Sequence, residues 1–345
     1  MNWNEYGSFI VEETKNLLAI DSPSGMTKKA AEHVMTRFEA LGYAPQMTRK
    51  DGVLVCLGGV DKENGLLLEA HMDTLGGMVC QIKANGRLKI TPIGGLRAEN
   101  VETENCRVVT KFDGVIEGTA QLINASTHVN EKYADTQRTF DTIEIVLDEP
   151  VESADDVKKL GIRTGDYVCF EPRTRVTQSG YIKSRFLDDK LSVGILLGYA
   201  KYLKDEQITP ERAVYVHITS FEEVGHGGSA SVPAGVTEAI SVDMGCVGEG
   251  LTCDERMVSI CAKDSGGPYH YDVVRGLIAA AEKMGAPYAV DVYPRYGSDV
   301  EATPRAGYDI RHGLIGSGVY ASHGYERSHV EGALATLKTL IGYVG

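Results

Sequence analysis

The chain has 345 residues, of which 43% are hydrophobic, and this is enough for two domains with a sizeable core. Its formal net charge of -13 at pH 7 excludes no small substrate, but it disfavours nucleic acid as a partner because few cationic side chains are available to neutralise phosphates. Seven scattered cysteines without a CxxC pair indicate free thiols in a reducing compartment rather than a disulfide framework.

The N-terminal region is predicted to be helical rather than a targeting segment. It carries acids where a signal peptide needs a basic start, and no later apolar run approaches the ~18 residues of a membrane helix. The spacing of apolar residues predicts helices over residues 5–20 and 27–41; the sequence DSPSG ends the first and Gly42 caps the second. We therefore expect a cytoplasmic protein with no membrane partner.

Strand-like runs follow at residues 52–57 and 65–70, and the second leads directly into His71. Their alternation with helices predicts an α/β unit with a largely parallel sheet. From about residue 75 to about residue 177 the pattern changes to short β-rich runs separated by Gly, Asn and Asp turns, with one helical segment at residues 153–160. This pattern is typical of a compact β-barrel or sandwich.

Alternation of helices and strands resumes after this β-rich stretch. The sequence predicts a helix over residues 192–203, a strand over 213–221, a helix over 271–284, a strand over 287–292 and a final helix over 330–343. The predicted fold class is α/β, with a mostly parallel central sheet flanked by helices and an inserted β-rich, barrel-like domain. Residues 1–74 and 178–345 form the main domain in this prediction, and residues 75–177 form the insertion.

Short motifs along the chain place an acid or a histidine beside a strand-like run. In chain order they are EAHMD (residues 69–73), FLDDK (186–190), SFEEVG (220–225), SVDMG (241–245) and ASHGYE (321–326). Together they supply His, Asp, Glu, Asp and His, a set suited to two divalent ions that share a carboxylate. A second Glu beside the ligand Glu is available as the general base of a metal hydrolase.

The positions of these residues favour one shared site. His71, Glu222, Glu223 and Asp243 each follow an aliphatic run, and the carboxyl ends of parallel strands meet at one edge of a sheet. A lone HxD or EE pair is more commonly a polar turn or a solvated helix face, but SFEEVG leads into GHGG, which is poor helix material. Imidazole and carboxylate ligands without thiolate suit Zn, Co or Mn. Asp73 is placed to accept the far N–H of the His71 ring.

The motifs resemble those of the M42 metallo-aminopeptidases, relatives of the M20, M18 and M28 peptidases. That family typically shows AHxD after a strand, a DD pair, EEVG, VDxG and a C-terminal His, in the order found here, and has an extra domain where this chain has its insertion. The resemblance implies an aminopeptidase that acts on short peptides through a catalytic domain of residues 1–74 and 178–345. It also implies a homo-oligomer, dodecameric in that family, with the insertion serving oligomerisation or substrate access.

The resemblance assigns a metal-binding role to each motif. It implies two divalent ions per subunit, most simply zinc, with cobalt or manganese as alternatives. One ion would be held by His71 and Asp243. The other ion would be held by Glu223 and His323. The Asp188 carboxylate would bridge both ions.

The resemblance also assigns the catalytic residues. Glu222 would accept a proton from the attacking water, and Asp73 would orient His71. The residues alone indicate a metal hydrolase, so a related dimetal amidase or deacylase, or an M20-like carboxypeptidase acting on a modified dipeptide, stays open. The complete ligand set disfavours a non-catalytic relative, and a glycosidase needs two carboxylates without a metal set.

The last metal ligand has two candidates. Many family members read RYxHSPxE near the C-terminus, whereas this chain reads VYASHGYERSH, so His323 and His329 compete. The spacing from Asp299 favours His323. Ser328 fits the N-cap of the closing helix, which would place His329 in the first turn, facing solvent or the pocket rim.

Overall fold

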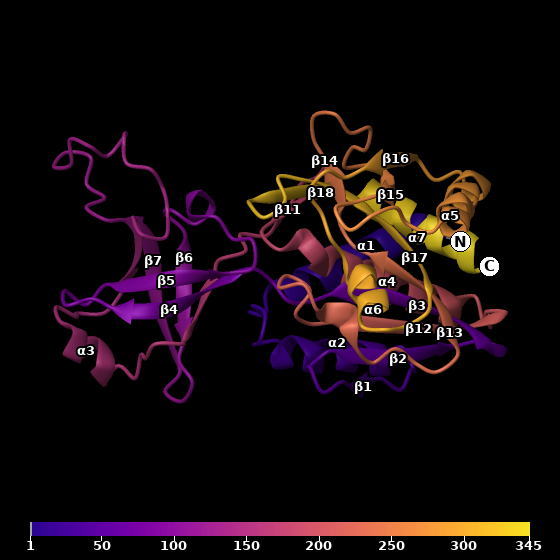
Figure 1. Ribbon diagram of the computed structural model, residues 1–345, viewed down its shortest axis with the longest axis horizontal. Coiled ribbons are helices and arrows are strands. Elements are labelled where there is room, and N and C mark those ends of the chain that lie inside the picture. The colour runs from indigo at the N-terminus through magenta and orange to yellow at the C-terminus, as the bar shows by residue number, and fades with distance from the viewer. Residues whose placement is uncertain (1) are drawn as a thin grey trace. The chain divides into compact units, whose positions relative to one another are not determined.

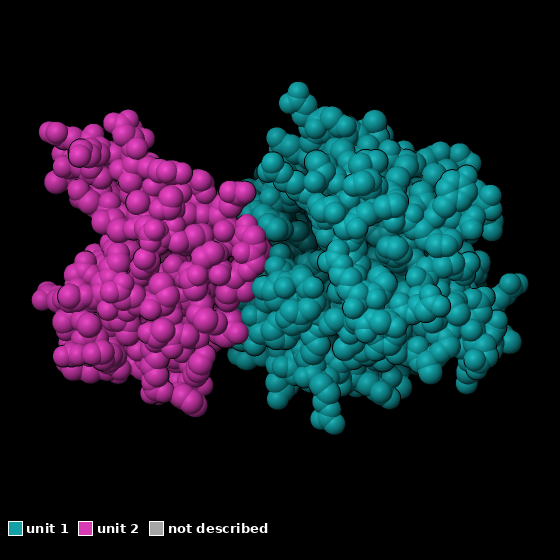
Figure 2. Space-filling view, viewed as in Figure 1, with its two compact units in different colours: residues 1–74, 173–345 teal, residues 75–172 magenta. Residues whose placement is uncertain are grey.

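The computed structural model describes residues 2–345, which form two compact units. Unit 1 comprises residues 1–74 and 173–345, and unit 2 comprises residues 75–172 (Figure 2). The sequence placed the second boundary after residue 177. Residues 173–177 belong to unit 1 because β10 (Arg175–Val176) pairs with β11 (Tyr181–Ser184), which in turn pairs with β18 (Glu326–His329).

Unit 1 is built on a 12-stranded sheet whose main path runs β1-β2-β12-β3-β13-β17-β18-β11-β10. The four strands at its centre, from β12 to β17, are parallel neighbours, while the strands beyond them on both sides pair antiparallel. The α/β fold class is confirmed, with the parallel order concentrated in the middle of the sheet. The remaining strand bounds are β1 (Gln46–Met47), β2 (Val53–Gly58), β3 (Asp61–His71), β12 (Arg212–Thr219), β13 (Val236–Val242), β14 (Gly245–Val247), β15 (Val258–Lys263), β16 (Tyr288–Val292) and β17 (Arg311–Tyr320).

The strand β3 shows why this sequence forms a central strand. Its first residues are exposed, but every residue from 65 to 71 is buried, and Leu66, Leu67 and Leu68 are fully so. A strand covered on both faces needs such a continuous apolar run instead of an alternating one. The run ends on His71, so the strand carries a polar side chain to the edge of the core.

Helices cover this sheet (Figure 1). The helix α4 packs against α1, α7 and β3, and its side chains are buried almost continuously from its start to residue 200. Across residues 2–345, no helix combines the length and apolar character needed to cross a membrane. The helices of unit 1 are α1 (Trp3–Leu18), α2 (Lys28–Ala40), α4 (Leu187–Asp205), α5 (Tyr271–Met284), α6 (Asp299–Arg305) and α7 (Val330–Val344), with a short 3-10 turn η2 (Gly227–Ser229).

Unit 2 is a closed barrel with the strand order β4-β5-β8-β7-β6-β9. Inward-facing residues such as Val79, Ile90, Val108 and Ile145 form its core, while alternate positions face outward. A short helix, α3 (Ala154–Lys159), is capped by the Ser153 hydroxyl. The strands are β4 (Gly76–Ile82), β5 (Leu88–Ile93), β6 (Asn105–Val109), β7 (Val115–Leu122), β8 (Ile143–Leu147) and β9 (Tyr167–Phe170), with a 3-10 turn η1 (Ala98–Asn100).

Candidate metal centre

The candidate site lies at the carboxyl ends of the central parallel strands of unit 1. His71 ends β3 and is in register with Thr219, the last residue of β12. Glu222 and Glu223 follow β12 in a turn, and Asp243 follows β13 directly. Because these strands are neighbours and run in the same direction, their ends bring the motifs to one edge of the sheet, as the sequence predicts.

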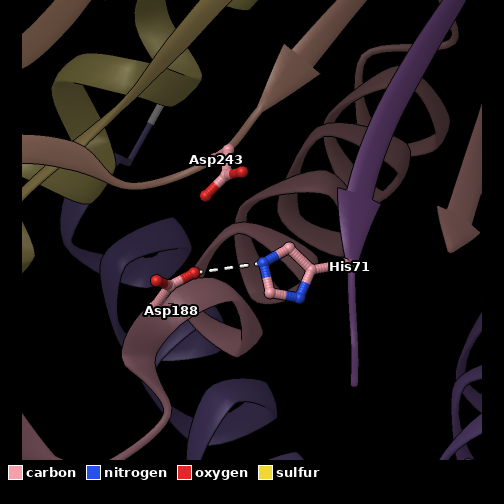
Figure 3. A group of neighbouring side chains, drawn as sticks. All are labelled: His71, Asp188 and Asp243. Carbon is pink, nitrogen blue, oxygen red and sulfur yellow. Dashed lines mark hydrogen bonds and ion pairs between the residues drawn. The ribbon is translucent and has the colours of Figure 1, made fainter. Parts of the chain in front are cut away.

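His71, Asp188 and Asp243 form the first group of possible metal ligands. One ligand atom from each lies within 4.8 Å of the others, and all three side chains are buried. The Nε2 atom of His71 is 3.1 Å from Oδ1 of Asp188. Figure 3 shows His71 at the end of a strand, Asp188 at the start of a helix, and the Asp243 carboxylate turned toward both.

Asp188, Glu223 and His323 form the second group, again with ligand atoms within 4.8 Å of one another. The Nε2 atom of His323 is 3.4 Å from Oδ2 of Asp188 and 3.7 Å from Oε2 of Glu223. Asp188 therefore offers one carboxylate oxygen to each group. A carboxylate shared between two sets of imidazole and carboxylate donors is the arrangement that a pair of divalent ions needs.

The electrostatics of the cluster reflect its burial and its excess of acids. Burial raises the pKa of Asp243 to about 7, and burial together with the charge of Asp188 holds the pKa of Glu223 well above its usual range. Burial alone would raise the pKa of Asp188, but hydrogen bonds from His323 and His71 outweigh it and lower that pKa. Buried charges of this kind are normally paired or coordinate a metal, and the donor set fits divalent cations.

Asp73 orients His71 by a different atom from the one predicted. The Nδ1–H of His71 donates to the backbone carbonyl of Asp73 at 2.9 Å, while the nearer carboxylate oxygen is 3.6 Å away. The carboxylate accepts hydrogen bonds from the Ser24 hydroxyl at 2.5 Å and the Glu222 backbone N–H at 3.1 Å. In the neutral ring this contact places the proton on Nδ1 and leaves the lone pair of Nε2 facing Asp188, which is the form that a metal ligand requires.

Glu222 lies beside both groups and belongs to neither. One of its carboxylate oxygens is 3.6 Å from Nε2 of His71, and the side chain remains 15% exposed. Burial and the charges of nearby acids, Asp243 and Asp299 among them, hold its pKa well above the usual range despite the opposing effect of His71. Its position next to the ligands, with access to solvent, suits a group that exchanges protons with a bound water.

Glu326 is a site residue to which the sequence assigned no role. Its buried carboxylate accepts the backbone N–H of Asp188 at 3.0 Å and that of His323 at 2.9 Å, so one side chain fixes two members of the second group. Asp189 acts similarly, accepting the His71 backbone N–H at 3.3 Å. Glu326 lies in the motif ASHGYE and Asp189 in the motif FLDDK. Their short distance in sequence from the candidate ligands was the only feature that could have predicted a role for them.

The structure separates His323 from His329. His323 lies in the turn between β17 and β18 with a left-handed backbone (φ 62°) and reaches the second group. Nδ1 of His329 accepts the Glu331 backbone N–H at 3.1 Å, and its Nε2–H donates to the carbonyl of Ser179 at 2.7 Å. Both nitrogens of His329 are therefore already engaged.

The predicted N-cap of the closing helix is wrong. His329 caps α7, whereas the Ser328 hydroxyl donates to the carbonyl of Gly318. The expectation that His329 faces solvent or the pocket rim is also wrong, because this side chain is buried edge-on against Tyr181, with 4.8 Å between ring centroids. The aromatic contact and the cap together fix the ring away from the candidate ligands.

Known proteins resemble this chain in sequence and in fold. The sequence matches the family described as M42 glutamyl aminopeptidase over residues 51–339. YhfE from Bacillus subtilis (strain 168), provisionally named as an aminopeptidase, is 41% identical over 334 residues, covering 97% of this chain and 96% of its own.

Solved structures share the fold at lower identity. The aminopeptidase APDkam598 from the archaeon Desulfurococcus kamchatkensis has a TM-score of 0.87 at 22% identity, covering 98% of this chain and 95% of that one. The Pyrococcus horikoshii TET1 peptidase, which can assemble into a tetrahedron or a large octahedral shell, has a TM-score of 0.84 at 22% identity, covering 97% and 99%. The fold of both units therefore recurs in aminopeptidases.

Proposed function

This chain belongs to the M42 peptidase family, and from that premise we propose that it is a dimetal aminopeptidase that removes the first residue of short peptides in the cytoplasm. The observation that carries the proposal is the pair of ligand groups joined by Asp188, with Glu222 beside them. A metal hydrolase needs both a charged frame that polarises the substrate and a separate group that moves the proton.

The metal frame would be provided by residues that are already in place. The first group would hold one ion, the second group would hold the other, and Asp188 would contribute to both. When bound, two zinc, cobalt or manganese ions would acidify a water molecule and polarise the scissile carbonyl. Glu326 and Asp189 keep this frame in position through the backbone N–H groups that they accept.

Glu222 would move the proton. It accepts one from the attacking water and returns it to the amine that leaves, so the carboxyl must be able to hold a proton at the working pH. The Asp73 carboxylate fixes the backbone of Glu222, and the Asp73 carbonyl fixes the ring of His71. One residue thus sets the distance between the general base and a ligand of the first group.

Family membership, rather than the geometry of the site, favours an aminopeptidase over the related amidase or carboxypeptidase. The test uses metal-reconstituted protein and one short peptide in free, N-acetylated and C-terminally amidated forms, with products identified by mass spectrometry. We expect loss of the first residue from the free and amidated forms and no cleavage of the acetylated form. Release of a C-terminal residue, or cleavage of the acetylated peptide, would contradict the proposal.

We also propose that the protein is a homo-oligomer that assembles through unit 2. The Pyrococcus horikoshii TET1 peptidase shares the fold of both units and can assemble into a tetrahedron or a large octahedral shell. The barrel of this chain exposes the apolar side chains of Phe112, Val115 and Val129 to solvent in the isolated subunit. Light scattering after size exclusion should give a mass several times that of the 37.3 kDa chain; a monomer at assay concentration would refute this assembly.

A further inference from the structure

A pocket opens beside Glu222, and its wall is formed by residues other than the candidate metal ligands. It has a volume of about 70 Å³ and lies within unit 1. Two glycines and Ala302 leave the space open, and Ser298 lines it with a hydroxyl. The charged residues of its wall are Glu222, Asp299, Glu301 and Arg305. Because Glu222 is the proposed base, a side chain adjacent to the cleaved bond would enter this pocket.

The carboxylates of the wall are buried more deeply than its one cation. The side chain of Glu301 is 10% exposed, whereas that of Arg305, its ion-pair partner at 3.1 Å, is 67% exposed. Asp299 is buried and is held by the Gly228 backbone N–H at 2.6 Å and the hydroxyl of Thr219. Water screens the charge of an exposed arginine far more than that of a buried carboxylate. When Asp299 and Glu301 are ionised, the interior of the pocket is therefore negative.

Two further residues border Glu301. Gly266 lies so close to the Glu301 carboxylate that an added Cβ would displace that side chain. Behind it stands the buried Asp264, which accepts the Tyr269 hydroxyl at 2.6 Å and the Gly266 backbone N–H at 2.8 Å. Once Glu301 has lost its proton, the second acid behind it deepens the negative potential inside the pocket.

We propose that this pocket receives the side chain of the first substrate residue and selects lysine or arginine, with Glu301 as the specificity-determining residue. The proposal rests on the proposed aminopeptidase function. A cationic side chain would pair with Glu301 as Arg305 does now, whereas a carboxylate would meet Glu222, Asp299 and Glu301 without a buried cation to balance it. The net charge of -13 would also draw cationic peptides toward the protein.

The experiment compares lysyl, norleucyl and glutamyl p-nitroanilides, since norleucine has the aliphatic chain of lysine without its ammonium. Burial, followed by the hydrogen bond with Asp264, raises the pKa of Glu301 to about 7, so assays belong at pH 8, where this carboxylate is charged. We expect the wild type to prefer lysyl over norleucyl substrate, and glutamyl to be the poorest. In Glu301→Gln, the lysyl-to-norleucyl ratio of kcat/KM should fall roughly 10- to 100-fold, as for a lost hydrogen bond to a charged group.

Two matched variants make the outcome specific. Arg305→Gln tests the exposed cation of the same pair, and Glu12→Gln removes one acid from an exposed position on α1. We expect both to keep the lysyl preference. A wild type that prefers glutamyl substrate and loses that preference in Arg305→Gln would overturn the proposal. A uniform fall for all three substrates in Glu301→Gln would also overturn it, because that pattern indicates contact with the α-amino group or a structural role.

A binding measurement separates this proposal from the proposed function. Calorimetric titration of lysine amide and norleucine amide into metal-loaded protein needs no turnover, and lysine amide should bind more tightly to the wild type but not to Glu301→Gln. If the wild type cleaves none of the substrates, the aminopeptidase assignment fails while the titration still decides the pocket. Equal binding of the two amides to the wild type would reject the lysine-selective pocket.

Discussion

The two units of this protein use acidic residues in opposite ways. In unit 2, exposed acids pair with cations at the surface: Asp141 with Lys89 at 2.6 Å, and Asp155 with Lys158 at 2.9 Å. The Lys89 ammonium lowers the pKa of Asp141. At the sheet edge of unit 1, Asp243 and its neighbours are buried beside histidine rings and backbone N–H groups, and burial raises the pKa of Asp243 to about 7.

The difference in burial distinguishes acids that contribute to solubility from acids that form a candidate functional site. A surface pair contributes little to stability and costs little, whereas a buried carboxylate without a cation is costly for the fold. Several buried carboxylates in one cluster therefore indicate a functional site, and a bound cation is the simplest way to offset the cost of burying them. Net charge does not reveal the distinction, because it counts both kinds of acid equally.

The largest effect expected from the buried set concerns Glu222. The Glu222→Gln variant should retain both metals yet lose on the order of 10² to 10⁴ in kcat, because the change removes proton transfer and keeps the ligands. Mass spectrometry measures whether the metals are retained, and turnover of a lysyl substrate measures the loss in kcat. Near-normal turnover would place the general base elsewhere, and loss of metal would make Glu222 a ligand.

The next effect distinguishes two histidines at the end of the chain. His323→Ala should lose one of two metals, with the stabilisation that metal gives, about 2.7 kcal/mol at 100 times its dissociation constant. His329→Ala should keep both metals and lose about 1 kcal/mol, because the ring caps α7. Metal analysis with thermal unfolding of both variants tests this. Depletion of metal in His329→Ala but not in His323→Ala would reverse the assignment.

A smaller effect concerns Asp299, a buried acid outside both ligand groups. Burial, followed by the charge of Glu69, raises its pKa from 3.8 to about 7. The folded protein therefore binds this proton more tightly than the unfolded chain, and the stabilisation is complete below about pH 4 and lost as the pH rises through 7.

The substitution Asp299→Asn removes the ionisation and leaves an acceptor for the Gly228 N–H. Relative to wild type, the free energy of unfolding of this variant should rise by roughly 1.4 kcal/mol per pH unit from pH 5 to the folded pKa of about 7, and then level off up to pH 8. Urea unfolding at several pH values measures the difference. A difference that stays constant with pH would show that Asp299 is not a buried acid of this kind.

The smallest effect is expected in the barrel. The free energy of unfolding of Asp141→Asn should differ from that of wild type by an amount that stays constant between pH 5 and pH 8. The reason is that Lys89 keeps the pKa of Asp141 low, so this carboxylate is already ionised throughout that range. Urea unfolding and peptide turnover should both match wild type. A pH-dependent difference as large as that of Asp299→Asn would remove the contrast between the two units.

Much of the fold follows from local patterns in the sequence. The helix predicted over residues 271–284 is α5, and the closing helix begins at Val330 as predicted, because apolar spacing acts over a few positions. The cap of the closing helix did not follow the local pattern, since it is His329 and not Ser328. The choice between barrel and sandwich for unit 2 required more. Closure depends on pairing between β4 and β9, which are far apart in sequence, and no local pattern encodes that register.

The candidate site follows the same division. The motifs predicted which side chains meet, because three of the candidate ligands, His71, Glu223 and Asp243, lie at or just after the ends of neighbouring parallel strands. Asp188 and His323 reach the same edge from the start of α4 and from the turn between β17 and β18. Glu326 escaped a role because it binds the backbone of Asp188, which is 138 positions away in the chain. The sequence also did not predict that the backbone carbonyl of Asp73 accepts the hydrogen bond from His71. The Asp73 carboxylate instead accepts a hydrogen bond from Ser24, a contact that only the tertiary structure creates.

The central claim is that the buried acids of unit 1 hold two divalent ions through one shared carboxylate. Anomalous diffraction from zinc-loaded crystals tests it most directly. Two peaks should appear, one among His71, Asp188 and Asp243 and one among Asp188, Glu223 and His323, and Asp188→Asn should weaken both. A single peak, a peak at His329, or an Asp188→Asn variant that keeps both ions at full occupancy would contradict the account.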